Sequence, residues 1–164
     1  IDKPQDFIVT CTTQPLVKEI QDLFLSDSDR VISADYLVKS VIPCNVSVFI
    51  KLVKRFSSSV IPIEKIKKDI FQYVNNIPFG EDLNISRIID ICHNYEIKRV
   101  DLPLLVSGSI VAPDAVSGSS IQLTATDILT IPSLPDKGIS NRTCTFFTNY
   151  FTSTGEESIG IEVV

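Results

Sequence analysis

Residues 45–54 have the sequence NVSVFIKLVK and follow Pro43. Every second residue in this stretch is apolar: Val46, Val48, Ile50 and Leu52. Successive side chains of a strand point to opposite faces of a sheet, so this spacing predicts a strand with one fully buried face and one mixed face. The strand belongs to a continuous block, residues 34–107, that decides the fold.

Two helices are predicted after this strand. Pro62 begins the first, and its apolar residues recur at spacings of three and four: Ile63, Ile66, Ile70, Val74 and Ile77. Such a stripe indicates a helix face that packs on a core, while Lys65, Lys67, Lys68 and Asp69 between these positions are expected in solvent. Pro78-Phe79-Gly80 then ends the helix, because glycine accepts backbone conformations that other residues avoid.

The second helix is predicted to begin at Asn84, whose side-chain oxygen can accept a hydrogen bond from the first helical turn. Leu83 before the cap and Ile88 after it can form a hydrophobic staple. Its apolar stripe contains Ile85, Ile88, Ile89, Cys92 and Tyr95. Residues 97–107 return to a strand pattern, with one face formed by Val100, Leu102, Leu104 and Val106.

The predicted fold class is therefore α+β. Residues 34–107 are expected to form a β-α-α-β unit, with two helices packed on one side of a small sheet. A β-rich C-terminal region, residues 108–164, should follow this unit. Residues 1–33 are expected to be an N-terminal arm or the tail of an upstream domain.

The two flanking regions carry weaker signals. In the N-terminal one, Phe7–Thr10 is a strand candidate and Pro15 begins a short helix with an apolar face, Leu16, Ile20, Leu23 and Phe24. In the C-terminal one, residues 107–120 are predicted to be a loop. Strands are expected at 121–126, continuing at 128–131, and then at 143–151 and 158–164 around a turn at Ser153-Thr154-Gly155.

The composition limits the classes of protein to which this chain can belong. The chain has 164 residues, of which 44% are hydrophobic and 21% charged, as expected for about one globular domain. Its net charge of −5 gives no general attraction to nucleic acid or anionic lipid, and no apolar run approaches the ~20 residues that span a bilayer. The sequence begins Ile1-Asp2-Lys3 and contains no Met, which predicts a longer native protein.

The four cysteines are widely spaced, at Cys11, Cys44, Cys92 and Cys144. Small disulfide-bonded domains pack their cysteines more densely, so buried free thiols are the favoured interpretation over a disulfide framework. This pattern favours assembly in a reducing compartment.

No group of residues has the spacing of a catalytic or metal site. His93 is the only histidine and has no predicted partner, and it points about 100° away from Cys92 on the helix. The acidic doublets Glu81-Asp82 and Glu156-Glu157 lie in turns, where carboxylates are usually solvated. We therefore expect no enzyme activity, no catalytic, metal or cofactor-binding residues and no cofactor.

Basic residues gather in the block and raise the alternative of RNA binding: Lys51, Lys54, Arg55, Lys65, Lys67, Lys68, Lys98 and Arg99. The KH module binds RNA through a G-x-x-G turn between two helices. Here the corresponding turn, residues 75–82, has one glycine and two acids that would repel a phosphate backbone. Charge pairing with a protein partner is the preferred interpretation, with no nucleic-acid or membrane partner.

One protein family shares the hydrophobic spacing of this block and its proline, glycine and serine positions. The matching features are residues 34–43, the alternating strand through Leu52, the helix with Ile66, Ile70, Tyr73 and Val74, then Gly80, Leu83, Ser86 and Ile88, and the closing Val100. In these features the chain resembles, over about residues 30–107, the C-terminal part of baseplate J-like proteins. These are baseplate wedge proteins of contractile-tailed phages, including the T-even wedge, and of related injection machines.

The resemblance implies a structural function in a virion. Proteins of this family form the wedge framework around the tail hub, and copies associate with one another and with other wedge subunits to link wedges into a ring. It implies a location in the tail baseplate after assembly in the host cytoplasm, and carries over no catalytic residues. The β-rich C-terminal region offers strand edges for pairing between chains.

A receptor- or carbohydrate-binding module of a tail protein is the alternative. Its basis is the aromatic cluster Phe146, Phe147, Tyr150 and Phe151, which could stack on sugar rings if exposed. Strand alternation places part of this cluster in a core instead, and core packing is the favoured interpretation.

Overall fold

The computed structural model describes residues 15–24, 40–111, 120–149 and 158–164, and it divides into two compact units, residues 1–40 and 41–164. The first unit contains helix α1 (Pro15–Phe24), which begins at the predicted proline. The predicted strand Phe7–Thr10 and residues 34–39 of the predicted block lie outside the described residues. None of the described helices is long and apolar enough to cross a membrane.

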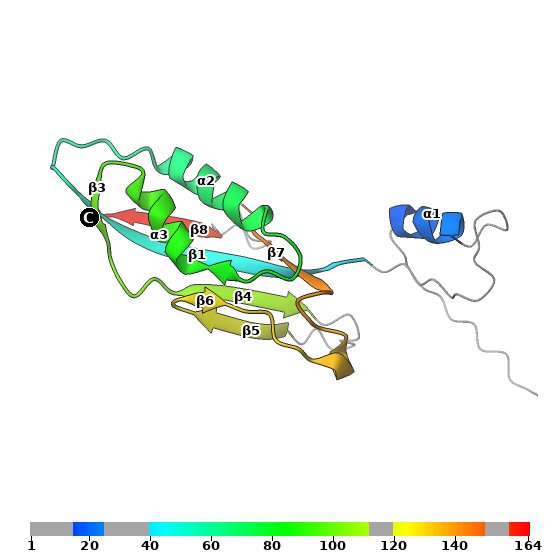
Figure 1. Ribbon diagram of the computed structural model, residues 1–164. Coiled ribbons are helices and arrows are strands. Elements are labelled where there is room, and N and C mark those ends of the chain that lie inside the picture. Colours follow the sequence, from blue (N-terminus) through cyan, green and yellow to red (C-terminus); the bar gives the residue numbers. More distant parts are fainter. Residues whose placement is uncertain (1–14, 25–39, 112–119, 150–157) are drawn as a thin grey trace, which may run out of the picture. The chain divides into compact units, whose positions relative to one another are not determined.

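The second unit combines helices with a mostly antiparallel sheet, so the α+β class is confirmed. Figure 1 shows α2 and α3 together on one side of this sheet. The elements are, in order, β1 (Ile42–Lys54), α2 (Ile63–Asn75), β2 (Leu83–Asn84), α3 (Ile85–His93), β3 (Ile97–Val100), β4 (Val106–Val111), β5 (Ser120–Ala125), β6 (Ile128–Leu129), a 3-10 helix (Pro135–Lys137), β7 (Cys144–Phe147) and β8 (Ile159–Val163).

Strand β1 is the centre of the sheet and pairs with two strands along each edge. On one edge it pairs antiparallel with β4 through residues 44–48 and with β3 through residues 52–54. On the other edge it pairs parallel with β7 through residues 42–45 and with β8 through residues 48–52. Strand β5 extends the sheet beyond β4, and β2 and β6 form a separate two-stranded ladder.

The predicted alternation of β1 is confirmed. Val46, Val48, Ile50 and Leu52 are all at most 3% exposed, and they face the helices. Helix α2 covers them with a buried stripe of Ile66, Ile70, Val74 and the following Ile77, and α3 with Ile85, Ile88 and Cys92. The opposite face of β1, which carries Asn45, Phe49 and Lys51, is exposed. An antiparallel sheet commonly leaves one face solvated in this way; we call it the open face.

The predicted start of α3 is also confirmed. The Oδ1 atom of Asn84 accepts a hydrogen bond from the backbone N–H of Ser86 at 2.9 Å, which satisfies one of the free donors of the first turn. Gly80 in the preceding turn has φ 84°, a conformation that favours glycine. Tyr73 fixes the junction from α2, because its hydroxyl donates to the Asn84 carbonyl at 3.0 Å and accepts from the Asn84 N–H at 3.2 Å.

The predicted strand 97–107 is wrong in its middle. It divides into β3 and β4, which pair with different parts of β1, and residues 101–105 between them include a cis Leu102-Pro103 peptide bond. Leu102 therefore does not share the buried face of Val100, Leu104 and Val106, and it is 69% exposed. Alternation predicts a face only within a continuous strand, and proline has no N–H for strand pairing.

The predicted loop at residues 107–120 is wrong at its start. Strand β4 continues to Val111, where Ser107, Gly108 and Ser109 pair with β1 and β5. Gly108 packs closely there: a Cβ at this position would lie 3.0 Å from the Cys44 Sγ atom, so a larger residue would require that side chain to shift. Glycine and serine predicted a loop, whereas here they allow close packing inside a sheet.

The last two predicted strands are present as β7 and β8, but both are shorter. They follow one another along the same edge of β1, in parallel with it. Between them the carbonyl of Val46 accepts a hydrogen bond from the buried hydroxyl of Thr148 at 2.9 Å. The Asn75 side chain completes the junction: its Oδ1 accepts from the Thr148 N–H at 3.0 Å and its Nδ2 donates to the Thr148 carbonyl at 3.1 Å. The predicted turn 153–155 lies outside the described residues.

The prediction of buried free thiols is confirmed for Cys44, Cys92 and Cys144. Burial raises the pKa of Cys44 and of Cys92 from 9.0 to about 12, so both thiols stay protonated at neutral pH. Cys11 lies outside the described residues.

Candidate interaction surface

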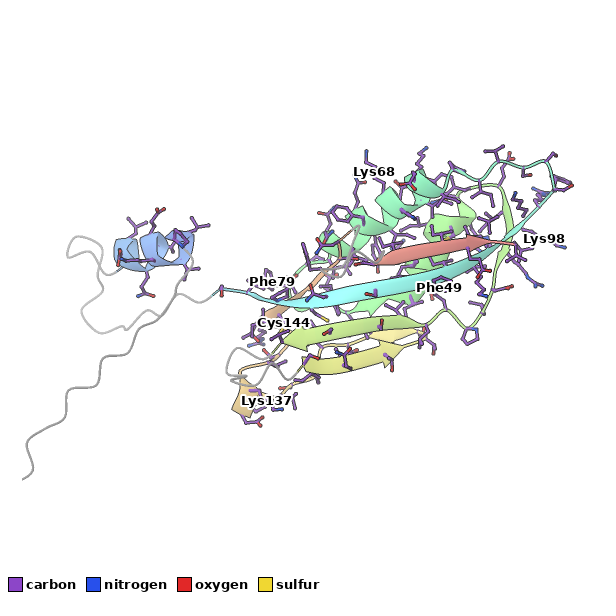
Figure 2. All side chains as sticks on the ribbon, turned by 180° about the vertical axis from the view of Figure 1, so that it is seen from behind. Phe49, Lys68, Phe79, Lys98, Lys137 and Cys144 are labelled. Carbon is purple, nitrogen blue, oxygen red and sulfur yellow. The ribbon has the colours of Figure 1, made fainter. Side chains whose placement is uncertain are left out.

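A shallow groove of about 750 Å³ crosses the open face of the sheet. Its floor and walls come from β1, from the start of β4, from the 101–105 break and from β8. Among the lining residues are Ser47, Phe49, Lys51, Leu102, Pro103, Leu105, Ser107 and Gly160. The break between β3 and β4 thus builds one wall, because it carries Leu102 and Leu105 out of the core. Figure 2 views the molecule from this side, with the sheet in front of the helices and Phe49 labelled on β1.

Apolar side chains form the centre of this groove. Leu102 is 69% exposed, Phe49 55% and Leu105 54%, although all three are large hydrophobic residues. Phe49 lies directly over Gly160, its partner in the β1–β8 register, and a Cβ on Gly160 would be only 2.8 Å from the Cδ2 of the ring. The missing side chain of Gly160 therefore sets the position of the ring against the sheet.

Two ion pairs flank the apolar centre. Lys51 Nζ lies 2.9 Å from Glu162 Oε2, and Arg99 Nε lies 3.0 Å from Asp101 Oδ1. Lys51 and Glu162 are cross-strand neighbours on β1 and β8, so the pair supports the sheet as well. All four side chains are between 40% and 65% exposed, which leaves their charges accessible to a partner.

The outer edge of β8 is a second surface suited to protein contact. Val164 donates to Leu52 at 2.9 Å and accepts from Lys54 at 3.1 Å, and Ser158 accepts from Val48 at 2.8 Å. Since backbone groups alternate in direction along a strand, Ile159, Ile161 and Val163 turn their N–H and C=O groups away from β1. Within the described part of the chain no other strand pairs with β8. A free edge of this kind can pair with another chain.

The residues considered for chemistry lie apart from one another. His93 is exposed at the end of α3, and the adjacent Cys92 is buried in the core. Glu81 and Asp82 line a second hollow of about 670 Å³ with Tyr73, Asn84 and Arg87. Glu156 and Glu157 lie outside the described residues. Among the residues that the structure describes, no three His, Cys, Asp or Glu side chains are placed to bind a metal.

One of the basic residues is not solvated as predicted. Lys67 is only 8% exposed, and its Nζ lies 3.7 Å from Glu64 one turn earlier. Positions 67 and 74 are seven residues apart and share a helix face, so Lys67 falls within the apolar stripe of α2 and buries its aliphatic stem. The prediction was wrong because it classified the residue by its charge and not by its position.

Phe146 and Phe147, two of the aromatic residues considered for receptor or carbohydrate binding, lie on opposite faces of the sheet. Phe146 is 3% exposed and belongs to the core, as predicted, while Phe147 is 38% exposed on the open face. Tyr150 and Phe151 lie outside the described residues.

The groove itself was not predicted from the sequence. A phenylalanine at an outward position of a strand, Phe49 among Ser47 and Lys51, was the available signal, because the alternation already placed it on the mixed face. Leu102 and Leu105 gave no signal, since the pattern assigned their segment to a continuous strand.

Comparisons of the chain with family models, characterised proteins and solved structures give no significant match.

Proposed function

We propose that this chain is a structural part of a phage tail baseplate wedge, where it associates with copies of itself and with other wedge subunits to build the baseplate ring. In this proposal residues 34–107 act as the β-α-α-β module, and the strands that follow extend its sheet. The function requires protein contacts and no catalytic group. It places the protein in the virion, after assembly in the host cytoplasm.

One observation carries the proposal: within the described residues of the second unit, both helices α2 and α3 lie on the other side of the sheet, and the open face exposes several large apolar side chains. Phe49, Leu102 and Leu105 are each more than half exposed. Contiguous exposed apolar surface surrounded by polar residues is typical of protein–protein contacts. The free edge of β8 beside this face supports the same conclusion, and the resemblance of residues 30–107 to wedge proteins names the kind of assembly.

Sedimentation velocity of the chain over a range of concentrations tests the proposal. We expect a dimer or larger species at about 100 μM protein, because an association with a micromolar Kd is then nearly complete. A chain that stays monomeric at this concentration would contradict self-association. Co-sedimentation with candidate wedge subunits then tests the second kind of partner.

Receptor or carbohydrate binding is the second candidate, and Phe147 on the open face is the observation that favours it. A single half-exposed ring offers one stacking surface, because Phe146 is buried. Glycan-array binding that is lost in Phe147→Ser would support this function over the structural one.

A further inference from the structure

We propose that the groove on the open face is the contact between two copies of this chain, related by a twofold axis that places Phe49 of each copy near the centre. This inference rests on the self-association in the proposed function and assigns its surface.

The groove has the anatomy of a protein interface. Its centre is apolar, with Phe49, Leu102 and Leu105, and its rim is polar, with the ion pairs Lys51–Glu162 and Arg99–Asp101. Interfaces between proteins combine a buried apolar core with a polar rim, and aromatic side chains near the centre contribute most to affinity.

The charges of the rim favour a second copy over a basic or acidic partner. Two cations and two anions surround the apolar centre, so the rim has no net charge although the chain carries −5. In a twofold contact the same patch meets itself, which requires that each patch supply both signs. Lys51 of one copy can then approach Glu162 of the other, whereas a highly charged partner would meet equal attraction and repulsion.

The shape of the face also suits a second sheet. Small side chains, Ser47 and Ser107, line the groove on the open face together with the larger Phe49. Two sheets pack face to face about 10 Å apart, with side chains of one fitting between those of the other. Two copies joined this way would form four layers, with the helices outside and the sheets inside.

The position of Phe49 lowers the cost of association. The ring rests against the Gly160 backbone, where a Cβ would be 2.8 Å from it. A side chain already fixed in its bound position loses less conformational entropy on binding.

Sedimentation equilibrium of the full chain and two matched phenylalanine variants tests this assignment. Phe49→Ser removes the ring from the groove, and Phe79→Ser removes a ring that is 58% exposed in the turn after α2. We expect Phe49→Ser to raise the dimer Kd at least about tenfold, as for a central aromatic residue, and Phe79→Ser to leave it unchanged. Leu102→Ser, at a 69% exposed position outside any strand, should weaken the dimer without affecting folding.

A charge exchange provides a second readout. Lys51→Glu should weaken the dimer because it places like charges together both within and between copies. Lys51→Glu combined with Glu162→Lys should restore it, since the pairs are re-formed with their signs exchanged. Circular dichroism of each variant verifies the fold.

The outcomes separate this inference from the proposed function. If the wild type dimerises and Phe49→Ser and Leu102→Ser leave the dimer Kd unchanged, as Phe79→Ser should, the open face is not the contact. Self-association would still stand in that case. A wild-type chain that remains monomeric would overturn both.

Discussion

At the scale of single residues, Asn75 takes the place of a strand where β7 ends. Its side-chain amide makes both hydrogen bonds with the Thr148 backbone that a neighbouring peptide group would make, at 3.0 and 3.1 Å. Thr148 in turn satisfies the carbonyl of Val46 in β1. The side chains of Asn75 on α2 and Thr148 after β7 thus satisfy these backbone groups at the interruption between β7 and β8.

Replacement of Asn75 tests this arrangement. Asn75→Ala leaves the buried backbone of Thr148 without two partners, and we expect it to lower the free energy of unfolding by about 1–3 kcal/mol. Asn76→Ala, the same change at the next and exposed position, should change it by less than about 0.5 kcal/mol. Urea denaturation followed by circular dichroism measures both; equal effects of the two changes would refute the bridging function of Asn75.

Tyr95 gives a prediction for the pH dependence of stability. Its hydroxyl donates to Asp69 Oδ2, and this hydrogen bond, with burial as a smaller cause, raises the pKa of Tyr95 from 10.0 to about 12. A pKa that is higher in the folded state means that the neutral phenol contributes stability below pH 10. That contribution is lost as the pH rises from 10 to about 12.

Ultraviolet titration of the tyrosinate checks the shift of Tyr95. The difference between the wild type and Tyr95→Phe isolates this residue, and Asp69→Asn should lower its pKa because the acceptor loses its charge. A titration of Tyr95 near pH 10 in the wild type would show that the hydrogen bond is not formed.

At the scale of elements, β8 has two unlike edges. The backbone groups of its even-numbered residues bond to β1, as do those of the flanking Ser158 and Val164, while the backbone groups of Ile159, Ile161 and Val163 point away from β1. Natural edge strands usually carry lysine, proline or a bulge that prevents pairing with other chains. Strand β8 has the sequence Ile-Gly-Ile-Glu-Val, with Glu162 as its single charged residue and no lysine, proline or bulge.

Hydrogen exchange of the β8 amides tests this difference. In the monomeric Phe49→Ser variant we expect rapid exchange at Ile161 and Val163 and slow exchange at Gly160, Glu162 and Val164, whose amides face β1. Exchange follows the opening of hydrogen bonds, so the alternation should be visible by NMR. Slow exchange at Ile161 would mean that another segment pairs with this edge.

The elements most fully predicted from the sequence are those whose residues follow one period. The core face of β1, the stripe of α2 and the cap of α3 were all predicted because local spacing and one capping side chain determine them. The β3–β4 break, the tandem order of β7 and β8 and the groove could not be predicted. These depend on which part of β1 each strand pairs with, and pairing between distant segments leaves no periodic signal in either one.

At the scale of the whole molecule, residues from both sides of Gly108 share one sheet. Strand β1 needs β3 and β4 on one edge and β7 and β8 on the other. We therefore expect residues 41–164 to unfold in one cooperative transition, as small single domains usually do.

Two fragments test this expectation. Residues 41–164 should fold alone, whereas residues 41–111 should not, because one edge of β1 and the core residues Cys144, Phe146 and Ile159 would be missing. Thermal unfolding followed by circular dichroism distinguishes them. A cooperative transition in the shorter fragment would show that β7 and β8 are an addition to an independent fold.

The central position of β1 has a consequence for biosynthesis. The carbonyl of Val46 accepts a hydrogen bond from Thr148, a residue 102 positions later. One edge of β1 therefore stays unpaired until the ribosome has made the last part of the sheet. During that interval a long, apolar strand is available to the wrong neighbour, including the same strand of another nascent chain. Translation on crowded polysomes, and shortage of a chaperone that binds extended apolar segments, should therefore lower the yield of this protein more than its final stability suggests.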